Sequence, residues 1–272
     1  MSELIVAHLG GVDPVMKRLI AAAGPLALDV RTDQSPFEAL ARAIAHQQLH
    51  GKAAQSILNR LITHCGQGAF PDPQALLALE DAALRASGFS FSKIAALRDL
   101  ATKTLSGIVP HRDALHALSD PEIIERLTAV RGIGRWTVEM LLMFQLQRPD
   151  VLPVDDFGVR YGFRLAYGLR KMPPPKALAL FGERWAPYRS AAAWYLWRAV
   201  DLARAGQLPA PGQPLKLPRL PRRRRKAAAK RRKGEPAVRR AAASAAPRAR
   251  SGARTRARRP PARRSRAPAK KK

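Results

Sequence analysis

The sequence predicts an all-α protein. Apolar residues recur at helical spacing through most of the first 208 residues, whereas the strict apolar–polar alternation of a half-buried strand is absent. Proline, serine and aspartate stand just before several of these segments, where such residues begin helices. No internal repeat with a period of roughly 20–50 residues is visible. A body of about 210 residues is long enough to bury a substantial core, as one large domain or two small ones.

Capping residues and breakers set the expected helix boundaries. Asp13-Pro14 and Ser35-Pro36 are typical helix starts, and Asp120 is interpreted as another cap. Residues 26–32 are interpreted as an extended link, because a lone strand would have no partner. Helices are expected over residues 14–23, 36–45, 52–64, 72–79, 81–86, 93–105, 112–118, 121–129, 137–146, 156–167 and 176–181, with a last helix starting at 187.

The motif RGIGRWT at residues 131–137 joins two helical segments. Gly132 and Gly134 allow backbone angles and close approaches that a side chain forbids. The turn leads into a helix N-terminus, where backbone amides bind an anion such as a phosphate, and Arg131 and Arg135 flank it. The alternative is an ordinary corner between two helices, because short glycine motifs also occur by chance.

A pair of carboxylates, Asp155 and Asp156, stands at the start of the next expected helix within LPVDD at residues 152–156. An aspartate at this position is a common helix cap. The alternatives are therefore that both residues only cap the helix or that one of them also does chemistry.

These motifs, in this order, resemble those of the helix-hairpin-helix (HhH-GPD) DNA glycosylase superfamily, and within it the DNA-3-methyladenine glycosylase II branch. The similarity includes PFEAL at 36–40, AIAHQQ at 43–48 and ERWAPYRS at 183–190. It covers most of residues 1–208, and this stretch is the expected glycosylase domain, with the hairpin at about 127–146. It implies two helical subdomains with a cleft between them. Helices over about 36–118 form one, and the N-terminal segment with the C-terminal helices forms the other.

The resemblance also implies residue roles. Asp156 matches the catalytic aspartate, 24 residues after Gly132, and Asp155 is expected to cap the helix or to shape the turn. The residues expected to border the base pocket are Trp136, Trp197 and Phe157. The residues expected to bind DNA at the hairpin are Arg131, Gly132, Ile133, Gly134, Arg135 and Thr137. The expected wedge, which fills the gap left by a flipped base, is Gln48 or Leu49.

The expected reaction is hydrolysis of the bond between an alkylated purine and its deoxyribose. The sugar gains oxocarbenium character, which a nearby carboxylate stabilises while it orients or deprotonates the attacking water. An alkylated purine is already cationic, so it leaves without a second acid and is attracted to aromatic faces. Relatives that also cut the strand carry a lysine where Trp136 stands, so we expect release of the base only, leaving an abasic site.

Two other functions compete with this interpretation. One is a non-catalytic protein that coats DNA with its hairpin and a histone-like tail. The other is a glycosylase for oxidised or deaminated purines, because Phe157, Gly158 and Met140 replace bulkier or aromatic pocket residues of some relatives. Release of free base from alkylated duplex distinguishes them.

The C-terminal residues differ in composition from the body. Residues 216–272 hold 25 of the 49 Lys and Arg residues but only one acid, Glu235, and the whole chain has a net charge of +29. Such a segment cannot bury enough apolar surface to order itself. We therefore expect residues 209–272 to be a disordered DNA-binding tail, serving search, targeting or solubility.

Cofactors and location follow from what the composition lacks. The single cysteine, Cys65, excludes an internal disulfide and a four-cysteine iron–sulfur cluster. No side-chain metal site is expected, although the resemblance allows a monovalent cation at the hairpin carbonyls. No secretory signal or membrane-spanning run is visible. We expect a monomeric, cytoplasmic, nucleoid-associated protein of bacterial origin that acts on double-stranded DNA containing alkylated bases.

Overall fold

A computed structural model of the chain describes residues 2–30, 33–65, 68–212, 215 and 217, and these contain helices but no strand. The all-α prediction is confirmed. The chain divides into the units Met1–Arg222 and Arg223–Lys272, and every described residue belongs to the first. The expected tail lies, from residue 218 onwards, outside the described residues.

The helices are α1 (Ser2–Val12), α2 (Pro14–Ala23), α3 (Pro36–His46), α4 (Gly51–Cys65), α5 (Pro73–Ala78), α6 (Asp81–Ser87), α7 (Phe91–Leu105), α8 (Arg112–His116), α9 (Asp120–Thr128), α10 (Arg135–Phe144), α11 (Phe157–Ala166), α12 (Pro175–Gly182), the 3₁₀ turn η1 (Glu183–Trp185) and α13 (Arg189–Arg204).

Most helices begin where the sequence predicts, because the capping residues form the expected hydrogen bonds. Ser35 Oγ accepts the Glu38 amide at 3.1 Å at the start of α3, and Asp13 Oδ1 accepts the Val15 amide at 3.0 Å at the start of α2. The cap assigned to Asp120 is wrong. Ser119 is the N-cap of α9, and its amide donates to the Glu122 carboxylate at 2.8 Å in a capping box.

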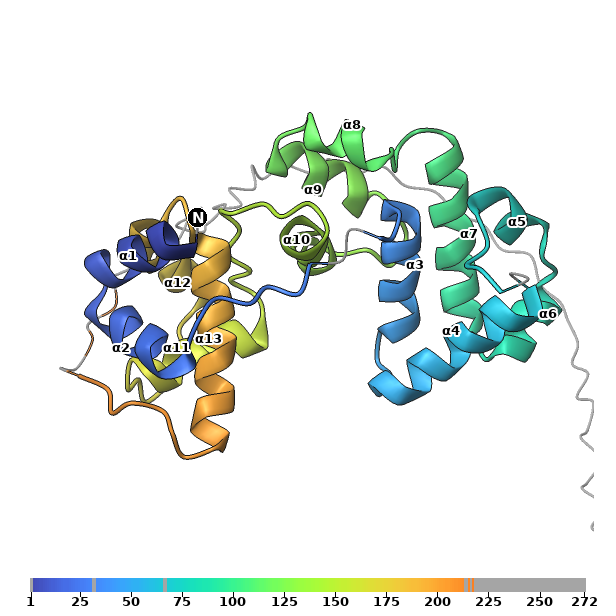
Figure 1. Ribbon diagram of the computed structural model, residues 1–272. Coiled ribbons are helices and arrows are strands. Elements are labelled where there is room, and N and C mark those ends of the chain that lie inside the picture. The colour runs from blue at the N-terminus through green and yellow to red at the C-terminus, as the bar shows by residue number, and fades with distance from the viewer. Residues whose placement is uncertain (1, 31–32, 66–67, 213–214, 216, 218–272) are drawn as a thin grey trace, which may run out of the picture. The chain divides into compact units, whose positions relative to one another are not determined.

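Within the first unit the helices pack in two groups (Figure 1). In one, α7 packs against α3, α5 and α6, α4 packs against α3 and α6, and α10 packs against α3 and α9. In the other, α13 packs against α2, α11 and η1, while α1 packs against α2 and η1. These groups agree with the expected subdomains, except that α9 and α10 extend the first group. One apolar core, with Leu40, Leu97 and Leu196 fully buried, runs through both.

Helix α1 is a feature that the sequence analysis did not predict. Its only buried residue is Leu9, and it contains Gly10 and Gly11, which lower intrinsic helix propensity. Tertiary packing forms this helix, because α1 lies against both α2 and η1. A pattern that depends on one buried side chain is too weak to be detected by periodicity.

The Asp13 carboxylate joins the N-terminal helices to the C-terminal ones. It is only 2% exposed, and besides capping α2 it accepts hydrogen bonds from the Tyr167 hydroxyl at 2.6 Å and the Trp185 indole at 3.0 Å. Contact with this carboxylate and burial raise the pKa of the Tyr167 phenol well above its ordinary value, burial being the larger cause. The Asp13 carboxyl group is tolerated in this buried position because several donors satisfy its oxygens.

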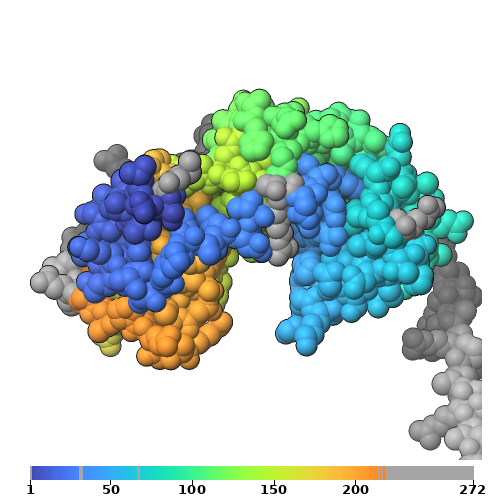
Figure 2. All heavy atoms as spheres, viewed as in Figure 1, coloured from blue at the N-terminus to red at the C-terminus, as the bar shows by residue number. Residues whose placement is uncertain are grey.

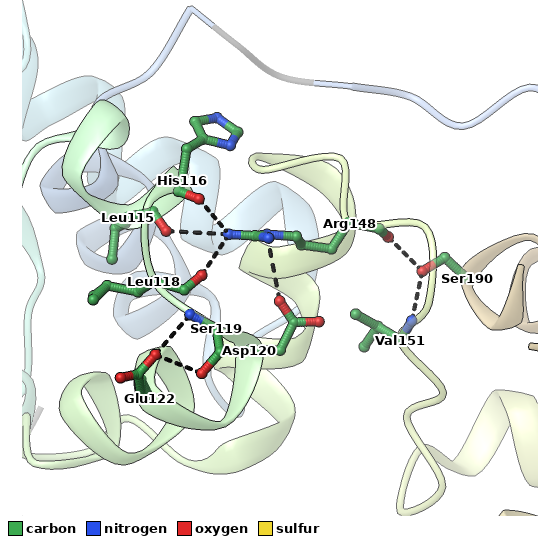
Figure 3. Close-up of polar contacts among 9 residues, drawn as sticks. All are labelled: Leu115, His116, Leu118, Ser119, Asp120, Glu122, Arg148, Val151 and Ser190. Atoms are coloured by element: carbon green, nitrogen blue, oxygen red, sulfur yellow. Dashed lines mark hydrogen bonds and ion pairs between the residues drawn. The ribbon is translucent and has the colours of Figure 1, made fainter. Parts of the chain in front are cut away.

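A second polar cluster fixes the segment that leads from α10 to α11 (Figure 3). Arg148 pairs with Asp120 at 3.3 Å, while its own carbonyl accepts the Ser190 hydroxyl at 2.6 Å. The Arg148 guanidinium also donates to three backbone carbonyls, those of Leu115 and His116 at the end of α8 and that of Leu118 just after it. Ser190 Oγ in turn accepts the Val151 amide at 3.0 Å. The start of α13 is thereby tied to the loop before α9.

Helices α11 and α13 approach more closely than any side chain at Gly162 would allow. A Cβ at this position would lie 1.8 Å from the Leu196 carbonyl oxygen and 2.7 Å from its carbon. Both are backbone atoms, so relief of the clash would require the two helices to separate.

Among the described residues, none of the helices is long and apolar enough to span a membrane.

Gly162→Ala is therefore expected to reduce the free energy of unfolding by about 3 kcal/mol or more, since it forces two packed helices apart. The matched control is Gly11→Ala, whose new Cβ would meet nothing within 4 Å on an exposed face of α1. That change is expected to stabilise the protein by up to about 1 kcal/mol, as alanine is the better helix former. Urea denaturation followed by circular dichroism measures both; equal stability of the two variants would contradict the close approach.

Candidate active site

The hairpin between α9 and α10 has the geometry that its two glycines predict. Gly132 has φ +79°, a left-handed conformation, and Gly134 is the N-cap of α10 without a side-chain cap. The first-turn amides of α10 are consequently free of a capping side chain and directed outward at the positive end of the helix dipole. Such a terminus binds an anion without further help.

The six hairpin residues assigned to DNA binding do not all present side chains to solvent. Ile133 is 4% exposed and Thr137 is 8% exposed, so both side chains pack inward and anchor the hairpin. Contacts of these two residues with DNA would therefore be made by their backbone, and their assignment to DNA binding stays a prediction. Arg135 is 63% exposed, and its Nε donates to the Glu139 carboxylate at 2.8 Å.

Two side chains of α7, Asp99 and Lys103, hold the hairpin through hydrogen bonds to its backbone. Asp99 accepts the Arg131 amide at 2.7 Å and the Lys103 ammonium at 2.8 Å, and Lys103 also donates to the Ala129 carbonyl at 2.5 Å. Burial alone would raise the pKa of the Asp99 carboxyl, but the hydrogen bonds from Arg131 and Lys103 outweigh it and lower the pKa below its usual value. The sequence analysis missed Asp99, because 32 residues separate it from Arg131.

The Asp156 carboxylate is fixed by donors from three helices. Oδ1 accepts the Val159 amide at 2.7 Å and the Trp197 indole N–H at 2.9 Å, while Oδ2 accepts the Trp136 indole N–H at 2.8 Å. Asp156 is thus the N-cap of α11, one of the two roles that the sequence analysis offered for Asp155. The cap role is wrong for Asp155, which lies exposed in the turn just before α11.

Gly158 makes room for one of these donors. A Cβ at Gly158 would lie 2.8 Å from Cδ1 of Trp197, 3.0 Å from its Nε1 and 3.1 Å from Asp156 Oδ1. The Trp197 ring stacks on Phe144 of α10, with ring centroids 5.9 Å apart and planes at 23°. The indole is therefore clamped between α10 and the start of α11, and its N–H is directed at the carboxylate.

A groove of about 970 Å³ opens between α3 and α10; Asp156 is not part of its lining, but Trp136, which donates to Asp156, is. Figure 2 shows the first unit hollowed next to the light-blue surface of α4. The lining residues from α10 are Trp136, Thr137, Met140, Leu141 and Phe144. Trp136 is 48% exposed, so one indole both lines the groove and donates to Asp156.

The expected pocket residues are only partly brought together. Trp136 lines the groove, whereas Trp197 does not line it and instead stacks on Phe144, which does. Phe157 does not line it: the ring is 70% exposed and stacks on Tyr161, with centroids 5.6 Å apart and planes at 11°. An exposed helix start places Phe157 at the surface next to Asp156.

The two wedge candidates differ in position. Gln48 lines the groove and has φ +57°, a conformation that costs a non-glycine residue energy and is frequent at functional sites. Leu49 is 40% exposed and is not part of the lining. This placement favours Gln48.

The sequence analysis also missed a second carboxyl group, that of Glu139, and this one is buried. It is 3% exposed on α10, where burial, together with Asp155 and Asp156, raises its pKa against the opposing effect of Arg135. The signal that could have found it is the i, i+4 spacing from Arg135.

The described residues contain no cluster of three or more His, Cys, Asp or Glu side chains that could hold a metal ion. The cation at the hairpin carbonyls stays a prediction.

Comparison with known proteins places this geometry among DNA repair proteins. The model of the family described as HhH-GPD superfamily base excision DNA repair protein matches residues 41–187. The chain is 44% identical over 197 residues to DNA-3-methyladenine glycosylase 1 of Schizosaccharomyces pombe, covering 72% of this chain and 86% of that protein. It is 31% identical to DNA-3-methyladenine glycosylase 2 of Escherichia coli, covering 68% of this chain and 64% of that protein.

Solved structures agree with the sequence comparison. The S. pombe 3-methyladenine DNA glycosylase (Mag1) in complex with abasic DNA superposes with a TM-score of 0.67 at 43% identity, over 74% of this chain and 98% of that one. A DNA-3-methyladenine glycosidase from Bacillus halodurans superposes with a TM-score of 0.68 at 36% identity, over 74% and 91%.

Asp99 should make the hairpin's stability depend on pH. Because its folded pKa lies below the unfolded one, about 4, its stabilisation is present above that value and is lost as the pH falls through the folded pKa. Asp99→Asn is expected to lower the free energy of unfolding at pH 7 by about 1 kcal/mol, a small value because the carboxylate is partly exposed. Denaturation between pH 7 and 3 measures this, with the exposed Asp33→Asn as control. A deficit that persists unchanged in acid would contradict it.

Proposed function

We propose, from the premise that this chain belongs to the HhH-GPD superfamily of base excision DNA repair proteins, that it excises alkylated purines from DNA. The relatives are DNA-3-methyladenine glycosylases. We further propose the glycosylase II type, with 3-methyladenine-like lesions in double-stranded DNA as substrates and a monomer as the active form. The observation that supports this best is the Asp156 carboxylate, which is held by two indole N–H groups beside a groove.

The hairpin supports binding of the DNA backbone. Phosphate oxygens accept hydrogen bonds from the open amides at the start of α10, and the exposed guanidinium of Arg135 lies in the same turn. Arg131 flanks the turn from the other side. These contacts carry no sequence preference, as expected for an enzyme that acts wherever damage occurs.

The reacting base enters the groove after it has left the helical stack. Gln48 fills the gap in the duplex, and the base lies against the Trp136 ring, whose face attracts a cationic purine. The volume of the groove, about 970 Å³, lies in the range of small-molecule sites, roughly 300–1,000 Å³, so it has room for a purine. Met140 and Phe144 line the same wall and contribute apolar contact.

The chemistry requires one carboxylate. As the bond from C1′ to the purine nitrogen breaks, its electron pair leaves with the base and the sugar becomes positive. Asp156 stabilises that charge and orients or deprotonates a water, whose oxygen adds to C1′. Both carboxylate oxygens receive N–H donors from the protein, which fix the orientation of the group for this role.

The reaction stops at an abasic site. Cleavage of the strand by a glycosylase of this superfamily uses a lysine amine, which attacks C1′ and forms a Schiff base. Trp136 occupies the corresponding position here, and its indole nitrogen donates its hydrogen to Asp156. Position 136 therefore supplies no amine, and the product keeps an intact phosphate backbone.

Asp156→Asn tests the catalytic assignment. The substitution keeps the size of the side chain but removes its charge, so single-turnover release of 7-methylguanine from a methylated duplex should fall by at least about a hundredfold. Affinity for an abasic duplex should change little. Asp155→Asn is the matched control, since this neighbouring carboxylate is exposed. If the control lost more activity than Asp156→Asn, the assignment would be wrong; if the wild type released no base, the proposed function would fail.

The basic C-terminal residues support a second prediction. Residues 218–272 lie outside the described residues, but their Lys and Arg content suits phosphate contacts without sequence preference. Affinity for undamaged duplex should fall steeply with salt, by a log–log slope of about −0.9 per phosphate contact. A chain ending at Gly212 should show a much flatter slope, with turnover on a short damaged duplex at low salt nearly unchanged. Equal slopes would indicate a solubilising or targeting role instead.

A further inference from the structure

The loop between α3 and α4 is bonded directly to the hairpin. Gln47, the C-cap of α3, donates from its side-chain Nε2 to the Gly132 carbonyl at 2.7 Å, across 85 residues of sequence. Both residues line the groove. This hydrogen bond links the hairpin to the turn that carries the wedge residue.

The Gly132 carbonyl, which accepts this hydrogen bond, faces Gln47 in the left-handed conformation that Gly132 adopts in the hairpin. Gly132 has φ +79°, and a Cβ there would lie 3.5 Å from Cβ of Ala96 and 3.9 Å from Oε1 of Gln47. The turn is thus packed between α7 and the Gln47 amide, and a change in the hairpin conformation would redirect its carbonyl away from Gln47.

The donor side is equally constrained. Gln48 follows Gln47 directly and has φ +57°, which the surrounding contacts must hold in place because it is unfavourable for a residue with a Cβ. Lys93 of α7 donates to the Ala45 carbonyl at 2.6 Å and so fixes the end of α3. Helix α7 therefore supports the wedge turn through Lys93 and the hairpin through Asp99.

We propose that Gln47 is a positioning residue that couples the wedge turn to the hairpin. When the hairpin is seated on the DNA backbone, the Gln47–Gly132 hydrogen bond sets the place from which Gln48 enters the duplex. Hairpin binding and wedge insertion are then one event. This inference rests on the proposed function, but it assigns Gln47 no contact with the reacting base.

The first test measures insertion without chemistry. A duplex carrying 2-aminopurine beside a tetrahydrofuran abasic analogue becomes more fluorescent when a wedge unstacks the 2-aminopurine. Gln47→Ala and the nearly isosteric Gln47→Glu, which replaces the N–H donor with an acceptor, should both reduce the fluorescence increase at saturating protein. Single-turnover release of 7-methylguanine should fall by about fivefold, the effect of one neutral hydrogen bond. Affinity for undamaged duplex should change by less than about twofold, since Gln47 makes no phosphate contact.

A double-mutant cycle separates positioning from general stability. If Gln47 acts through Gln48, adding Gln47→Ala to Gln48→Ala should change neither fluorescence nor rate by more than about twofold. Gln74→Ala, an exposed amide on α5, is the matched control and should behave as wild type. Thermal denaturation of each variant shows whether it is folded.

Three results would overturn the inference: wild-type behaviour of both Gln47 variants, losses that add fully to those of Gln48→Ala, or no fluorescence increase with the wild type. Failure of the wild type to release 7-methylguanine would instead refute the proposed function, and the fluorescence arm would still decide the coupling because it requires no excision.

Discussion

The arrangement around the Asp156 carboxylate constrains the rest of the structure. Its oxygens receive N–H donors from the first turn of α11, from Trp136 of α10 and from Trp197 of α13. Because hydrogen bonds to a carboxylate are effective only within a few tenths of an ångström, three helices from both helix groups must meet at one point. The missing side chains at Gly158 and Gly162 allow α13 to come close enough to do so.

Buried and half-buried polar side chains hold in place the point where α10, α11 and α13 meet. Arg148 and Ser190 fix the segment before α11 to the start of α13, and Asp150 pairs with Arg189 through two hydrogen bonds of 2.7 Å each. The Arg189 guanidinium lowers the pKa of the Asp150 carboxyl, so this pair stays ionised over the range in which most proteins are stable. Apolar packing supplies the cohesion of the two helix groups, whereas these directional bonds determine their register.

Local signals in the sequence were sufficient for most helices, whereas the choice of Asp156 as the reacting carboxylate came from the resemblance and stays a prediction. Pro, Ser and Asp starts and 3.6-residue periodicity report interactions within one turn, which is why α2, α3 and α11 were found. The errors lie where the outcome depends on distant residues. Periodicity could not reveal that α1 forms by packing on η1, nor that Asp156 caps its helix while Asp155 is exposed. The inward packing of Ile133 and Thr137, the exposure of Phe157 and the partner of Gln47 likewise depend on tertiary contacts.

The fixed position of the Asp156 carboxylate determines whether the protein or the DNA changes conformation during recognition of a lesion. This carboxylate accepts hydrogen bonds from two indoles of the protein itself, one of which lines the groove, so the fold positions this group through its own contacts. The deformation is then carried by the nucleic acid, which must break pairing and stacking to deliver a nucleotide. Discrimination between damaged and normal purines begins with how often each base pair opens spontaneously. A base whose pairing is weakened by an alkyl group costs less to unpair and unstack, which is one source of selectivity for damaged purines.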